Sequence, residues 1–191
     1  MSNSNCFSCD TQDYLKTYNC ILDNMIKEMN CACQNNSISN NFINQMIPHH
    51  EAAIAMCENV LQYTDNHTLR CICKNIIEQQ KKSICCMREI QGGCDRYCSS
   101  GRCLASYRNS TQRIMNNMFI SMRNATQTNC INCNFLRQMI PHHEGAVCMC
   151  ENLLKYDICP GLTTIARDII ADQQRGICEM KELMCELDCC K

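Results

Sequence analysis

The sequence predicts an all-α protein in which one helical unit is used twice. Apolar residues recur with the 3.6-residue period of a helix, and the alternation that is typical of strands is absent. The chain also aligns with itself without a gap when it is shifted by 93 residues. In the best block, Phe42–Tyr63 against Phe135–Tyr156, 15 of 22 positions are identical. We therefore expect two pseudo-symmetric three-helix units.

The first unit, residues 1–91 with a cysteine-containing N-terminal tail, is predicted to contain three helices. Inward-facing stripes indicate helices over about 13–33, 40–62 and 68–90. An Asn- and Ser-rich stretch before the second helix can supply its N-cap. Gly92-Gly93 is expected to end the third helix.

The second unit, residues 105–191 with a cysteine-rich C-terminus, repeats this pattern after a Gly-, Ser- and Cys-containing linker over 92–104. Its helices are expected near 107–125, 133–156 and 162–188. Pro48 and Pro141 fall in the second helix of each unit, where proline removes a backbone hydrogen bond. Each proline therefore either kinks its helix or marks the start of one.

Composition excludes several classes of partner and favours a soft metal. The 18 basic and 19 acidic residues nearly cancel, which gives no electrostatic reason to expect nucleic acid or an anionic membrane. The chain begins without a basic or apolar signal-like segment, so the expected location is the cytoplasm. In a reducing cytosol, 22 cysteines indicate thiolate ligands, and 13 methionines add a second sulfur donor.

The central motif is Met-Ile-Pro-His-His-Glu, which occurs at Met46–Glu51 and Met139–Glu144. Helical geometry puts the two histidines on either side of the direction of the methionine, with a further methionine and cysteine one to two turns later. Imidazole, thioether and thiol donors suit Cu(I), whereas Mg²⁺ and Ca²⁺ require oxygen ligands. The alternative is that the histidines are hydrogen-bonded core residues and the methionines fill space.

The residues around this motif resemble the DUF305 family. The resemblance rests on F-x-x-Q-M-I-P-H-H-E-x-A-x-x-M-C-E-x-x-L, then L-x-x-I-x-x-x-I-I-x-x-Q and I-C-x-M, over about 38–90 and 131–183. It implies a ferritin-like, four-helix-type bundle, and some members bind copper through Met and His. Members are commonly exported and are not usually rich in cysteine. The residues that carry over as metal ligands are Met46, His49, His50, Met56, Met87, Met139, His142, His143, Met149 and Met180.

Several cysteines are added to this ligand set on their spacing. Cys57 and Cys150 follow the histidines on the same stripe, although a core-filling role is equally open for both. Cys130/Cys133 form a C-x-x-C pair at a helix start, where a thiolate is stabilised. A continuous helix would bring Cys185 and Cys189 together on one face, with Cys178 two turns before. No zinc-ribbon spacing occurs, so zinc is less favoured than copper.

Gln80 and Gln173 are predicted to face inward, where they either orient the imidazoles or form hydrogen bonds between helices.

The favoured function is binding, storage or detoxification of Cu(I), without enzyme activity. The alternative is a structural protein of a spore coat or surface filament, a homo-oligomer cross-linked through cysteines at the cell or spore surface. A di-iron oxidase is disfavoured because no Glu-x-x-His pair occurs.

Overall fold

The computed structural model describes residues 7–189, so the tail cysteine Cys6 and the C-terminal Cys190 lie outside the described residues. Within that range the chain forms six α-helices and no strand, which confirms the predicted all-α class. The helices are α1 (Cys9–Cys31), α2 (Ile38–Val60), α3 (His67–Cys94), α4 (Gly101–Arg123), α5 (Ile131–Leu153) and α6 (Pro160–Glu186).

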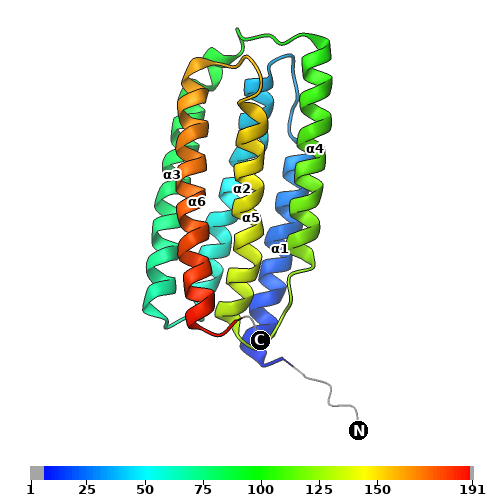
Figure 1. The fold of residues 1–191 in the computed structure, drawn as a ribbon. Helices are drawn as coiled ribbons and strands as arrows, with labels where there is room; N and C mark the ends of the chain where they lie inside the picture. The colour runs from blue at the N-terminus through cyan, green and yellow to red at the C-terminus, as the bar shows by residue number, and fades with distance from the viewer. Residues whose placement is uncertain (1–6, 190–191) are drawn as a thin grey trace.

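The six helices lie side by side in three layers, and each layer consists of one pair of helices (Figure 1). Helices α2 and α5 form the middle pair, α3 and α6 cover one side of it, and α1 and α4 cover the other. Helices α2, α3, α6 and α5 therefore close into a four-helix bundle, and α1 and α4 are added to its α2–α5 face. The expected four-helix-type architecture is confirmed, with each unit contributing one helix to every layer.

The middle position of α2 and α5 explains their unusual burial. Both helices are buried on most of their faces, whereas the outer helices bury only one stripe each. Helix α2 carries seven of the buried polar side chains, and no charged side chain is buried among the described residues. No described helix is both long and apolar enough to cross a membrane.

Helix starts follow the capping rules. Ser37 accepts a hydrogen bond from the backbone N–H of Asn40 at 3.3 Å, as expected from the Asn- and Ser-rich stretch. Both prolines lie well inside their helices, because α2 begins at Ile38 and α5 at Ile131. Pro48 and Pro141 therefore do not mark helix starts.

Two predicted helix ends are wrong. Helix α3 continues through Gly92 and Gly93 to Cys94, and a Cβ at either glycine would meet nothing within 4 Å, so the glycines impose no break. The non-helical connection to α4 is consequently only residues 95–100. Helix α6 ends at Glu186, and Asp188 adopts a φ of 57°, which turns the chain away from the helix axis.

Replacing Gly145 by alanine should destabilise the protein, because α4 and α5 approach closely there. A Cβ at this position would clash with Met118 Sδ and lie 2.7 Å from its Cγ. Overpacking of this kind costs about 1–3 kcal/mol, more than the helix-propensity gain of up to about 1 kcal/mol from removing glycine. Urea unfolding should therefore show a net loss for Gly145→Ala. The control Gly93→Ala, on an open surface, should gain about 0.5–1 kcal/mol. Shifts of the same sign in both variants would contradict this packing.

Candidate metal centre

The four histidines of the two motifs form a buried cluster, called here the histidine core. His49 and His50 come from α2, and His142 and His143 from α5, and none is more than 1% exposed. Because α2 and α5 are the middle pair, side chains on their facing sides have no route to solvent except between helices. The predicted inward position of the histidines and methionines of both motifs is confirmed.

His49 and His142 contact each other across the pseudo-two-fold axis of the duplicated chain. Their rings stack with centroids 3.7 Å apart and planes 29° from parallel. His49 Nε2 lies 3.2 Å from the carbonyl oxygen of His142, and His142 Nε2 lies 3.2 Å from the carbonyl oxygen of His49. The two units are therefore joined at their centre by one reciprocal pair of hydrogen bonds.

This reciprocal pair fixes the tautomer of both rings. A carbonyl oxygen only accepts, so each Nε2 must carry the proton that it donates, and in a neutral imidazole Nδ1 then holds the lone pair. Both Nδ1 atoms are buried without a hydrogen-bond partner, as are those of His50 and His143. A buried polar atom that stays unpaired costs about 1–3 kcal/mol. The cluster therefore contains four buried ring nitrogens that the protein itself leaves unpaired.

The two outer histidines have different surroundings. His50 Nε2 lies 3.0 Å from the hydroxyl of Ser83 on α3. The equivalent residue in the second unit is Gly176, where a Cβ would lie 3.3 Å from His143 Nε2. The hydroxyl partner is thus present in one copy only. Sequence reasoning missed this contact, although the Ser83/Gly176 difference is visible in the internal alignment.

Burial keeps the histidine core neutral. Loss of hydration lowers the pKa of His50 to about 3 and that of His142 to about 4. The pKa values of His49 and His143 are also lowered, first by burial and then by the neighbouring imidazoles. Neutral imidazoles are the form that binds metal, so these side chains need not lose a proton to act as ligands.

The predicted methionine ligands are all buried. Each is at most 2% exposed, and they come in equivalent pairs from the middle layer and from α3 and α6: Met46/Met139, Met56/Met149 and Met87/Met180. The same burial also fits the space-filling alternative. The structure therefore places these thioethers inside the protein without assigning them a ligand role.

The thiols of Cys57 and Cys150 do not join the histidines. Cys57 lies beside the thiol of Cys73, and burial raises its pKa, as it does that of Cys150. At 1.5 Å per residue, Cys57 is about 10 Å further along α2 than His50. Among the described residues, three His, Cys, Asp or Glu ligand atoms lie within 4.8 Å of one another only at Cys130, Cys133 and Cys189, and neither the histidine core nor these two thiols form such a group. Imidazole, thioether and thiol lie along one buried stripe of α2, as expected, with the thiol about two turns from the histidines.

The predicted inward position of Gln80 and Gln173 is confirmed, and both are 2% exposed. Neither amide forms a hydrogen bond to an imidazole within the described part of the chain, and both Oε1 atoms are buried without a partner. They extend the set of unpaired polar atoms in the bundle interior.

The C-terminal cysteines are arranged differently from expectation. Cys185 and Cys178 are exposed on α6, but Cys189 lies beyond the helix end and forms a disulfide with Cys133. The predicted Cys185–Cys189 pairing on one helical face is therefore wrong, because α6 stops at Glu186. The sulfurs of Cys130, Cys133 and Cys189 all lie within 4.8 Å of one another, so three predicted ligands do come together.

A groove between α3 and α6 leads toward the histidine core. It has a volume of about 290 Å³ and is lined partly by Ser83, whose hydroxyl contacts His50.

The glutamates of the two motifs lie at the surface, away from the histidine core. Glu51 pairs with Arg88 at 2.8 Å and Glu144 with Lys181 at 3.1 Å, and all four side chains are largely exposed. The acidic residue of the motif therefore tethers α2 to α3 and α5 to α6 at the surface.

The stability of the metal-free protein should fall as the pH drops below about 6.5. Above that value both folded and unfolded histidines are neutral, so no proton is taken up on unfolding. Between about 6.5 and the folded pKa values of about 4 and 3, only the unfolded state binds protons. Each such histidine then removes about 1.4 kcal/mol of stability per pH unit.

Urea unfolding at several pH values between 5 and 7.5 measures this slope. The double variant His50→Leu/His143→Leu should show a shallower slope than the parent, since two of the titrating groups are gone. An equal slope in both proteins would mean that the outer histidines are not buried as neutral rings.

The comparisons with known proteins agree with this geometry. The sequence profile of DUF305, described as a domain of unknown function, matches residues 22–91 and 39–184. CopM in its Cu(I)-bound form is 30% identical, with 78% of this chain and 96% of that chain covered at a TM-score of 0.58. CopM in a silver-bound form is 29% identical over 80% and 98% of the two chains, also at 0.58.

A further solved structure supports the fold alone. The DUF305 fragment from Deinococcus radiodurans is 22% identical, covering 78% of this chain and 95% of that chain at a TM-score of 0.58. No curated protein sequence matches the chain. With the profile spanning both copies of the Met-Ile-Pro-His-His motif, the chain belongs to the DUF305 family.

Proposed function

We propose that this protein binds Cu(I) in the interior of its four-helix bundle and serves to store or detoxify it. The observation that carries the proposal is the histidine core, in which four neutral imidazoles are buried with every Nδ1 unpartnered. The proposed ligands are these nitrogens together with the buried thioethers of the Met-Ile-Pro-His-His motifs, Met46 and Met139.

The donor set favours a soft monovalent ion. Imidazole nitrogen and thioether sulfur are neutral ligands, and no buried carboxylate is present among the described residues to offset a metal charge. Burying an uncompensated divalent ion in such an interior costs far more than burying a monovalent one, because Born energy rises with the square of the charge. Thioethers also select Cu(I) over harder ions. Both arguments disfavour Zn²⁺ in the histidine core.

The relatives support the same chemistry at low identity. The CopM structures include Cu(I)-bound, Cu(II)-bound and silver-bound forms. Silver and Cu(I) are both soft monovalent ions, which is the class that the neutral core of this chain would accept. The proposed role is binding rather than catalysis, since the histidines face one another and the backbone rather than a substrate-sized cavity.

Removing the central imidazoles should weaken Cu(I) binding. Exposed thiols are first alkylated on the folded, reduced protein, and Cu(I) is then titrated anaerobically against a coloured Cu(I) chelator. The parent should retain at least about one tightly bound ion per chain. The variant His49→Leu/His142→Leu should lose about 10–100-fold or more in affinity, the loss that even supporting groups of a metal site cause.

His67→Leu is the matched control, because His67 is exposed at the start of α3 and lies outside the histidine core. This variant should bind Cu(I) as the parent does. Circular dichroism establishes that each variant is folded. Equal affinities in the core variant and the control would remove the basis of the proposal.

A cross-linked structural protein is the second candidate, favoured by the distribution of thiols. Most free cysteines in the described range are exposed, and the exposed ones occur on every helix except α2 and in several connections. Such thiols could join copies of the chain into an oligomer or filament after oxidation. Metal-free protein exposed to air should then give high-mass species on a non-reducing gel that a thiol reductant disperses. A chain that stays monomeric under these conditions is not a disulfide-linked structural protein.

A further inference from the structure

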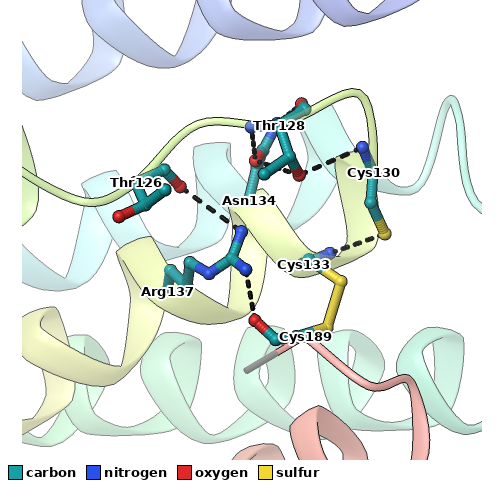
Figure 2. The surroundings of a disulfide bond; sticks show 7 residues. All are labelled: Thr126, Thr128, Cys130, Cys133, Asn134, Arg137 and Cys189. Atoms are coloured by element: carbon teal, nitrogen blue, oxygen red, sulfur yellow. Dashed lines mark hydrogen bonds between the residues drawn. A yellow bond between two sulfur atoms is a disulfide. The ribbon is translucent and has the colours of Figure 1, made fainter. Parts of the chain in front are cut away.

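The start of α5 and the end of the chain meet in a cluster of three sulfurs, called here the three-thiol corner. Cys130 is the N-cap of α5, Cys133 lies in its first turn, and Cys189 follows α6 (Figure 2). Cys133 and Cys189 are joined as a disulfide and buried, whereas Cys130 is a free, exposed thiol within reach of both.

The same corner of the first unit is built without a disulfide, although the thiol of Cys94 there contacts that of Cys159. The residues equivalent to Cys130 and Cys133 are Ser37 and Asn40. Ser37 donates to the carbonyl oxygen of Cys94 at 3.0 Å, and Asn40 donates to the carboxylate of Asp95. Ordinary hydrogen bonds therefore suffice to hold the end of the third helix against the start of the second. The three sulfurs of the second unit are not required by the fold.

Contacts other than the disulfide hold the three-thiol corner in place. Arg137 donates to the carbonyl oxygen of Cys189 and reaches that of Thr126 at 3.5 Å, as Figure 2 shows. The backbone N–H of Cys189 donates to Met184 at 3.0 Å, and that of Cys133 to Cys130 Sγ at 3.4 Å. The backbone positions of all three cysteines thus remain defined when the S–S bond is broken.

We propose that the reduced three-thiol corner is a Cu(I) site of three thiolates, which the Cys133–Cys189 disulfide closes. A dithiol reductant transfers two electrons to the disulfide, becomes a disulfide itself, and leaves Cys133 and Cys189 as thiols. Cu(I) then replaces the three thiol protons, which are released to solvent. Oxidation by a disulfide reverses the first step. The exposed Cys130 receives the ion first, and the two buried sulfurs complete the trigonal set.

The surroundings match the charge and coordination of this complex. Three thiolates and one Cu(I) carry a net charge of −2, and the site lies at the N-terminus of α5, whose partial positive charge stabilises anions. The Arg137 guanidinium adds a full positive charge nearby. Zn²⁺ takes four ligands in structural sites, and the group of described residues here offers three.

This inference rests on the proposed function only in taking Cu(I) as the cargo, because the three-thiol corner and the histidine core share no residue. An experiment that disproves one of the two sites therefore leaves the other untouched. Loss of binding in His49→Leu/His142→Leu concerns the core alone, and that variant should keep the thiolate signal of the corner.

The test variant is Cys130→Ser/Cys133→Asn/Cys189→Ser, which gives the helix start the residues that the first unit already uses in a folded corner. The matched control is Cys20→Ser/Cys71→Ser/Cys103→Ser, which removes three exposed thiols from separate helices. Both are reduced with a dithiol, freed of reductant anaerobically and titrated with Cu(I) in competition with a chelator, and the near-ultraviolet sulfur-to-copper band is recorded.

The parent and the control should bind one more tightly held Cu(I) per chain than the test variant and show its absorption band. Parent protein in the disulfide form should lack that ion and regain it after reduction. Equal tight stoichiometry in the test and control variants would overturn the site, and so would tight binding that is unaffected by reduction. Preference of the corner for Zn²⁺ over Cu(I) in direct competition would overturn its assignment to copper.

Discussion

The contact between His49 and His142 is the constraint on which the interior of the protein depends. Each ring donates to the other's main chain and stacks on the other's face, so α2 and α5 are joined directly through these two rings. Because the donors are both Nε2, the lone pairs are forced onto Nδ1 atoms inside the bundle. The Nδ1 atoms of both rings therefore lie buried without a hydrogen-bond partner.

The internal repeat made most of the fold predictable. Apolar periodicity located all six helices to within a few residues, except where the glycines were expected to end α3 and at the start of α4, and the repeated motif identified the buried histidines. The ring stacking across the axis could not be predicted, since it depends on how two helices from different units meet. The end of α6 at Glu186 was not predicted either, because the chain turns at Asp188 through a positive φ that the residue pattern does not indicate.

Equivalent positions in the two three-helix units show which side-chain properties the helix packing requires and which can vary. Equivalent ion pairs at Glu51 and Glu144 are retained with a change from Arg88 to Lys181, so charge alone is needed there. Ser83 becomes Gly176 beside the outer histidine, and Ser37 becomes Cys130 at a helix start. In each case the helix geometry persists while the chemistry changes. Duplication has let one copy acquire sulfur at a place where the other keeps hydrogen bonds.

The sandwiching of α2 and α5 between two outer pairs has a kinetic consequence. An ion bound among the central imidazoles, as proposed, would have to pass between packed helices, and the groove lined by Ser83 lies next to His50. The residence time of such an ion would then depend on how often the outer helices open, in addition to the strength of the metal–ligand bonds. Neutral ligands buried in this way would hold an ion for longer than the same ligands would at a solvent-exposed site.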